Sequence, residues 1–152
     1  MICAIPLVLF ALIITVTCDD KISCWGGGPR SKLRPTTFKA CRAVIKWLGS
    51  HDKEQGPITF SRRPGVGYRV PDQWLSGNCV VSIDMHSDDD VDTLSFREIA
   101  VEAYTIALGC VISPPHLGGD GHVGPKGVMN VTILGVDLKP DGPAPLIRHY
   151  EK

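Results

Sequence analysis

The chain has 152 residues, with 16 basic and 16 acidic side chains and a formal net charge of zero. This length fits one domain, and the balanced charge excludes attraction to nucleic acid or to an anionic membrane by net charge alone. We therefore expect no nucleic acid partner and no stable membrane association of the mature chain.

The first predicted element is a secretory signal peptide over residues 1–18. Ile2 to Val16 are almost entirely apolar, but this run is shorter than the roughly 20 residues with which a helix spans a bilayer. It matches the apolar core of a signal peptide, with cleavage expected just before Asp19. A membrane anchor is the alternative. A signal peptide predicts a secreted, extracellular protein.

Residues 19–35 are rich in glycine, proline and charge, and they predict an irregular N-terminal arm. The next segment, TTFKACRAVIKWLGS, places apolar residues three and four positions apart, which predicts a helix. We expect Thr36 or Thr37 to cap this helix and Gly49 to end it.

Three later segments alternate apolar and polar residues and predict strands. They are ITFSRR from Ile58, CVVSIDM from Cys79 and GVMNVTILGV from Gly127. PGVGYRVPDQWLSGN, between the first two, has turn-prone clusters and two prolines, so we expect a long loop with a short edge strand at Tyr68–Val70. The glycine-rich residues 113–127 predict a second loop.

The stretch DMHSDDDVDTLSFREIA follows the strand that begins at Cys79. Its SFRE sequence, from Ser95, matches a capping box, and apolar residues step by three and four from there to Cys110, which predicts a second helix. The acids of Asp84–Asp92 then lie in a strand-to-helix connection near the positive helix end. A calcium site is the alternative, although the stretch lacks the EF-hand arrangement.

This order of helix, strand, strand, helix and strand predicts an α+β fold over residues 36–138. Two amphipathic helices would cover one face of a small, mainly antiparallel sheet, giving a two-layer sandwich. The proline-rich residues 139–152 predict a flexible C-terminal tail.

Signal cleavage would leave Cys24, Cys41, Cys79 and Cys110. An even number of cysteines in a small secreted chain predicts two disulfides, and the absence of CxxC spacing argues against structural zinc. Because the second helix would run back along the strand that begins at Cys79, we expect the pairs Cys79–Cys110 and Cys24–Cys41.

The cysteine early in the first helix (Cys41), the GNCVVSIDM segment, the capped helix ending in Cys110 and the following Gly118-Gly119 form a pattern over roughly residues 38–137. This pattern resembles small secreted α/β proteins of filamentous fungi, of the necrosis-inducing-factor type or related to smut killer toxins. The resemblance implies an extracellular protein that acts on a host or on competing organisms, usually without known catalysis. It carries over no site residue.

HLGGDGH offers His116, Asp120 and His122, which are plausible ligands for a transition metal. Their spacing matches no supported metal motif, and a solvent-exposed loop is the alternative. GxSxG is absent, and pairing of all four cysteines would leave no thiol nucleophile. We expect no cofactor, no metal and no catalytic residue.

Asn130-Val131-Thr132 is a sequon for N-glycosylation. The predicted strand phase turns Asn130 away from the core, which makes modification possible, and a chance triplet is the alternative.

Taken together, these features predict a non-enzymatic, effector-like or binding protein whose partner is a host or competitor protein or surface. The alternatives are a small secreted hydrolase, metal-assisted through His116, Asp120 and His122, and a cell-wall surface protein.

Overall fold

The structure is a computed structural model that describes residues 22–26, 33–137 and 148–149. The expected signal peptide over residues 1–18 and nearly all of the expected tail lie outside the described residues. Within the described part, neither helix is long and apolar enough to cross a membrane.

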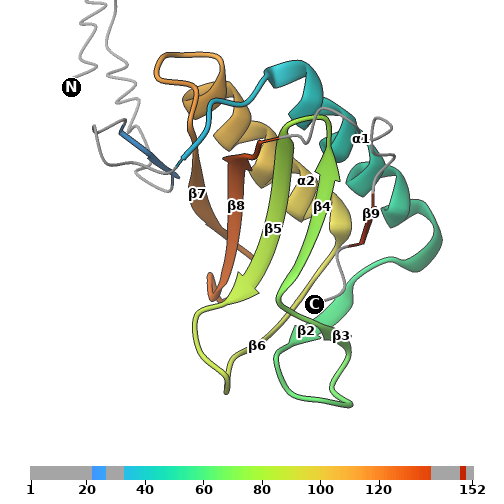
Figure 1. Cartoon of the computed structure of the whole chain (residues 1–152). Coiled ribbons are helices and arrows are strands. Elements are labelled where there is room, and N and C mark those ends of the chain that lie inside the picture. Colours follow the sequence, from blue (N-terminus) through green and yellow to red (C-terminus); the bar gives the residue numbers. More distant parts are fainter. Residues whose placement is uncertain (1–21, 27–32, 138–147, 150–152) are drawn as a thin grey trace, which may run out of the picture.

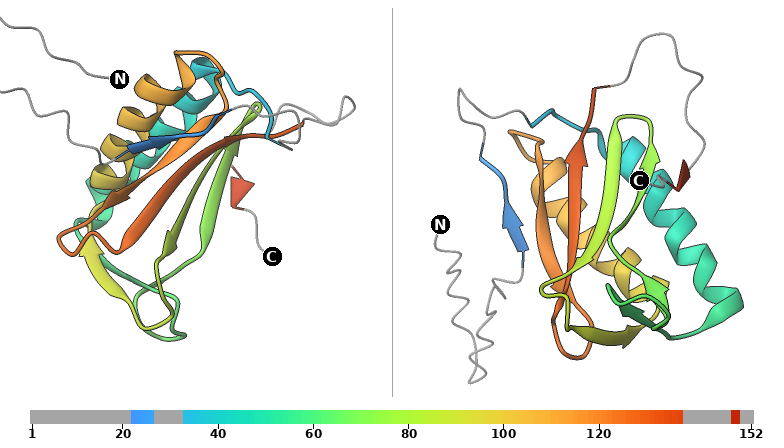
Figure 2. Two further views of the ribbon diagram at one scale, coloured as in Figure 1. Left: turned by 90° about the vertical axis from the view of Figure 1, so that its left-hand side faces the viewer. Right: turned by 60° about the horizontal axis from the view of Figure 1, so that its bottom comes forward.

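Two helices, α1 (Phe38–Gln55) and α2 (Phe96–Ile106), cover one face of a six-stranded sheet (Figure 1). The strand order is β1-β7-β8-β5-β4-β9, and every neighbouring pair is antiparallel. Seen from the side, both helices lie on the same side of this sheet (Figure 2). The predicted α+β two-layer sandwich is therefore confirmed.

The large sheet consists of β1 (Ile22–Cys24), β4 (Asp72–Ser76), β5 (Cys79–Met85), β7 (Gly118–Val123), β8 (Met129–Gly135) and β9 (Arg148–His149). A smaller sheet of order β3-β2-β6 lies at one end and consists of β2 (Ile58–Ser61), β3 (Tyr68–Arg69) and β6 (Val91–Leu94). A π-helical segment, η1 (Ala107–Val111), extends α2.

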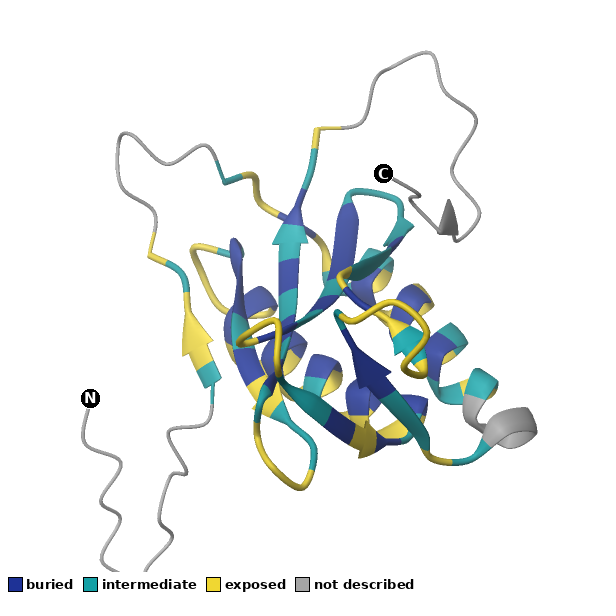
Figure 3. Ribbon diagram, turned by 90° about the horizontal axis from the view of Figure 1, so that it is seen from below, coloured by how far each residue is buried: buried dark blue, intermediate teal, exposed yellow. Residues whose placement is uncertain are grey.

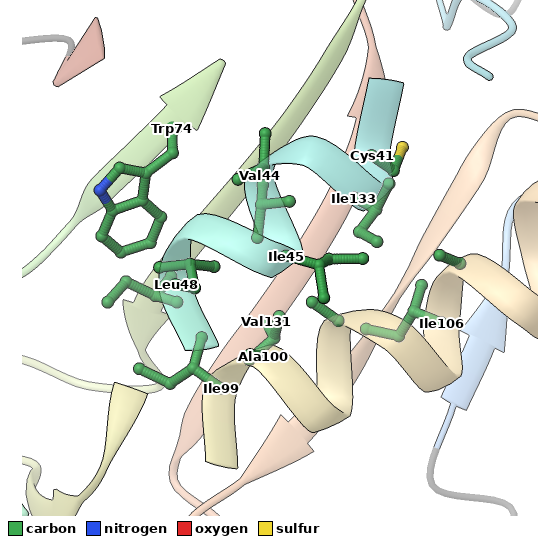
Figure 4. Packing of buried hydrophobic residues seen from close by; sticks show 14 of the residues in the cluster. Cys41, Val44, Ile45, Leu48, Trp74, Ile99, Ala100, Ile106, Val131 and Ile133 are labelled. Atoms are coloured by element: carbon green, nitrogen blue, oxygen red, sulfur yellow. The ribbon is translucent and has the colours of Figure 1, made fainter. Parts of the chain in front are cut away.

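The core fills the space between the helices and the large sheet. Alternate residues of β8, at Met129, Val131 and Ile133, are fully buried, as their strand phase predicts. They meet the buried faces of α1 and α2, including Leu48 and Ile99 (Figures 3 and 4). Each fully buried side chain of this size contributes about 1.5–3 kcal/mol relative to exposure.

The first helix continues past Gly49, so the predicted helix end is wrong. A Cβ added to Gly49 would lie 3.8 Å from the Cβ of Ala100 in α2. Gly49 thus lies at the contact between the two helices rather than in a left-handed cap. At the other end, Thr37 Oγ1 accepts the N–H of Ala40, as expected for a cap.

The predicted loop after β2 contains a strand, β4, which pairs along its length with β5. Trp74, in the middle of β4, is fully buried under α1 and lies 6.1 Å from the ring of Trp47. A two-residue turn at Gly77 and Asn78 joins β4 to β5, with Gly77 at φ +51°. The alternation in DQWLS is too short to outweigh the turn residues around it, which is why a loop was predicted.

The predicted loop over residues 113–127 contains β7, which is also a correction. Two of its glycines face the helical layer, where an added side chain would require neighbouring atoms to move. A Cβ on Gly119 would lie 2.3 Å from the carbonyl oxygen of Ser23, and one on Gly121 would lie 2.2 Å from Glu102 Oε1. Close packing, rather than a turn, explains these glycines.

Two short strands lie in segments that were predicted to be irregular or flexible. Ile22–Cys24 pairs with β7 at one edge of the sheet, so this part of the arm is regular. Arg148–His149 pairs with β4 at the opposite edge, so this part of the tail is a strand. In both cases an exposed strand edge supplies backbone partners that local sequence does not reveal.

Candidate functional site

All four cysteines of the described residues form disulfides, but the predicted pairing is wrong. Cys24 bonds to Cys110 and Cys41 bonds to Cys79. The expected directions of the elements hold, since α2 ends at the same end of the sheet where β5 begins (Figure 1). Their lateral positions decide the pairing. The first helix packs on β4 and β5, above Cys79, whereas the second packs on β7 and β8, beside β1 and Cys24.

The capping box at the start of α2 is present as predicted. Ser95 Oγ accepts the N–H of Glu98 at 3.2 Å, and Glu98 Oε2 accepts the N–H of Ser95 at 2.7 Å. The stretch between β5 and this cap is not one connection, however. Val91–Leu94 forms β6, which pairs antiparallel with β2.

The acids before β6 face arginines of the segment after β2. Arg62 binds both carboxylate oxygens of Asp84, at 2.7 and 2.8 Å, and one oxygen of Asp88 at 2.8 Å. The hydrogen bonds to Asp84, and then to Asp88, raise the pKa of Arg62. Arg63 binds Asp89 at 2.5 Å. Asp84, Asp88 and Asp89 thus each face an arginine counter-charge.

The three residues considered as a metal site do not converge. His116 Nδ1 lies 2.6 Å from the carbonyl oxygen of Val111, and Asp120 accepts the indole N–H of Trp25 at 2.9 Å. His122 lies beside His86, with ring centroids 5.7 Å apart. In the described part of the chain, no three His, Cys, Asp or Glu side chains gather around a possible metal position.

Asn130 lies on the sheet face opposite the helices, in line with its predicted phase. Its Nδ2 lies 3.4 Å from Thr132 Oγ1, and its Oδ1 is buried without a hydrogen-bond partner. Both side chains line a hollow of about 330 Å³ on this face, together with Gln73, Ser82 and Asp84. The sequon therefore lies within a regular strand in the middle of the sheet.

The outer surface of α2, η1 and the residue that follows them carries a row of exposed apolar side chains, which the sequence analysis missed. They follow one another at steps of three, four and four residues, with exposed fractions of 59, 43, 42 and 50% for Val101, Tyr104, Leu108 and Ile112. We name these four residues the apolar row. The signal was present in the sequence, because this helix is apolar on the face opposite its buried stripe as well.

The outer surface of α1 is basic. Lys39, Arg42 and Lys46 are exposed at steps of three and four, which places them on one helix face. None of the three forms an ion pair with another described residue. We name these three residues the basic row. The helices touch where the ring of Phe38 lies 6.0 Å from Tyr104, so the two rows belong to one helical surface.

Comparisons of this chain with protein-family models, with curated proteins and with solved structures found no match. The protein is a small, disulfide-stabilised α+β domain.

Proposed function

We propose that this chain is an extracellular, non-enzymatic binding protein of the effector type, which contacts a partner protein through the outer surface of α1 and α2. The observation that carries the proposal is the apolar row on α2. Outer faces of surface helices are normally polar, and contiguous exposed apolar side chains mark interaction surfaces.

The chemistry of the partner follows from the two rows. An apolar group would pack against Tyr104 and Leu108, since aromatic side chains supply much of the binding energy at the centre of interfaces. Carboxylates beside it would face the basic row, whose three cations have no counter-charge among the described residues.

The two disulfides support this assignment of the binding surface. One bond holds Cys41 of α1 and the other holds Cys110, which follows α2. Each bond therefore fixes one of the two helices that present the surface. A surface that is already ordered loses less conformational entropy on binding, and so gains affinity.

The extracellular location is supported by the same two bonds, because disulfides persist in oxidising compartments. The apolar sequence from Ile2 to Val16 and the resemblance to small secreted fungal proteins point in the same direction. A host or a competing organism would then supply the partner.

The test compares capture by the immobilised wild-type protein and by a variant with Tyr104→Glu and Leu108→Glu. Val66→Glu is a matched control, because Val66 is also an exposed apolar residue, at 37%, but lies in the β2–β3 loop. We expect a protein from host or competitor extracts that binds the wild type and the control, and that binds the double variant at least about tenfold more weakly, a loss of about 1.4 kcal/mol.

Arg42→Glu should weaken the same complex, and more strongly at low salt. Equal binding of the captured protein to the wild type and to the double variant would reject the helical surface as the binding site.

A further inference from the structure

Two histidines from different elements lie together on the sheet face that the helices leave uncovered. His86 directly follows β5, and His122 belongs to β7. Both are exposed, and their rings are 5.7 Å apart with an angle of 58° between their planes. Because β8 lies between β5 and β7, the two side chains meet above β8.

The ring nitrogens of this pair are available to a ligand. The imidazole of neither His86 nor His122 forms a hydrogen bond or an ion pair with another described residue, whereas the His116 ring lies within hydrogen-bond distance of a backbone carbonyl. The two rings are therefore close together, and their nitrogens remain able to bind a ligand.

Asn130 of β8 lies next to both histidines. It is the direct cross-strand partner of His122 on one side and of Asp84, two residues before His86, on the other. Directly opposed residues of antiparallel strands have Cβ atoms about 4.5–5.5 Å apart, on the same face. The Oδ1 atom of Asn130 is buried and has no hydrogen-bond partner, and an acceptor left in that state costs stability unless a ligand satisfies it.

We propose that His86, His122 and the Asn130 carboxamide oxygen form a binding site for a divalent transition-metal ion, Zn²⁺ or Cu²⁺. Imidazole nitrogen suits these ions, whereas Ca²⁺ and Mg²⁺ prefer sets of oxygen ligands. Two imidazoles bound to one tetrahedral ion at about 2.0–2.1 Å have ring centres roughly 5 Å apart, close to the separation in this structure.

Two neighbouring carboxylates are already hydrogen-bonded to other groups, so we assign only these three ligands to the site. Asp84, on the far side of Asn130, is held by two hydrogen bonds from Arg62. Asp120, two residues before His122 on the same face of β7, accepts from Trp25. Water would complete the coordination, so the ion would remain open on its solvent side.

This site is independent of the proposed partner surface, because it lies on the opposite face of the sheet from α1 and α2. Loss of metal binding would leave partner binding intact, and loss of partner binding would leave metal binding intact.

The test is calorimetric titration of the protein, purified without a histidine tag, with ZnCl₂ and separately with CuCl₂. We expect one ion per chain for the wild type and for His51→Asn, a control histidine that stacks on Trp47 in α1. His86→Ala and His122→Ala should each weaken binding at least about tenfold, since loss of a residue that merely orients a ligand already costs about 10–100-fold.

Asn130→Asp gives a gain-of-affinity test, because a carboxylate in place of the carboxamide should tighten binding of either ion. The protein carrying His86→Ala and His122→Ala should bind neither ion at this site. The proposal would be overturned if that double variant kept the wild-type affinity. It would also be overturned if the wild type bound no more metal than the double variant. Unchanged affinity in Asn130→Asp would remove Asn130 from the ligand set.

Discussion

The carboxylate of Asp92, in β6, accepts the backbone N–H of Lys126, which lies in the turn between β7 and β8, at 3.1 Å. Its other oxygen accepts the N–H of Thr93 at 2.9 Å. Asp92 is 2% exposed, and Lys126 Nζ donates to the carbonyl oxygen of Val91 beside it. One buried acid thus joins the small sheet to the large one.

Asp92→Ala should lower the free energy of unfolding by about 1–3 kcal/mol, because it leaves the partly buried N–H groups of Thr93 and Lys126 without this acceptor. The combined change of Asp88, Asp89 and Asp90 to Asn should alter stability little. Asp88 and Asp89 are exposed, and exposed ion pairs contribute weakly, while Asp90→Asn keeps a side-chain oxygen that can accept the N–H of Ser87. Urea unfolding of both proteins measures the difference. A larger loss in the triple variant would mean that the exposed ion pairs hold this region.

Ser95→Ala should cost on the order of 1 kcal/mol of unfolding free energy, because it removes the hydroxyl that accepts the N–H of Glu98 in the capping box. Ser87→Ala is a suitable control, as Ser87 is exposed and outside any helix. Thermal and urea unfolding of the two variants give the comparison, and equal stabilities would show that the cap contributes nothing.

Two glycine substitutions should have opposite effects. Gly49→Ala should stabilise the protein by about 0.5–1 kcal/mol, because alanine favours the helix and its methyl group would make an ordinary contact with Ala100. Gly119→Ala should destabilise it, because the methyl group would overlap the backbone carbonyl oxygen of Ser23. Differential scanning calorimetry of both variants decides the matter, and a stabilised Gly119→Ala would contradict the packing described for β7.

Tyr68 predicts a loss of stability at alkaline pH. Burial of its phenol, and then the hydrogen bond that it donates to Asp72, raise the pKa of Tyr68 in the folded chain. Tyr68 makes its full contribution to the free energy of unfolding below the tyrosine pKa of the unfolded chain, about 10. It falls as pH rises towards the folded pKa, because the unfolded state loses its proton first.

Unfolding free energies measured from about pH 9 to about pH 11 should therefore fall more steeply for the wild type than for Tyr68→Phe. The other tyrosines and the lysines titrate in both proteins, so the difference in slope isolates Tyr68. Parallel curves would show that its ionisation is not coupled to folding.

Peptide mapping under non-reducing conditions should recover Cys24 linked to Cys110 and Cys41 linked to Cys79. In the chain-entropy description, the sequence separations of 86 and 38 residues correspond to stabilisation of about 5 and about 4 kcal/mol. Replacing either pair by alanine should therefore lower stability by several kcal/mol. Recovery of Cys79 linked to Cys110 would contradict the placement of the helices on the sheet.

The sequence reveals the elements whose own residues specify them. The alternation in β5 and β8 and the spacing of Cys41, Val44 and Leu48 in α1 are local patterns, and the structure contains each element that they predict. The capping box at Ser95 is equally local, since both of its hydrogen bonds join residues three apart.

The features that could not be predicted depend on neighbours distant in the sequence. β7 contains glycines because β1 and α2 press against it, and the disulfide pairing depends on which strands each helix covers. The pairing of His86 with His122 likewise follows from strand order alone. Single-sequence periodicity carries no information about such lateral positions.

The two disulfides are nested along the chain, since both Cys41 and Cys79 lie between Cys24 and Cys110. A protease that cuts the backbone once anywhere between Cys24 and Cys110 therefore opens a covalent ring without releasing a fragment. The two chain segments stay joined by the Cys24–Cys110 disulfide, and the buried contacts between them still form because this bond keeps their local concentration high. Nicking inside this ring would alter the mass of the reduced protein while leaving the intact fold in solution.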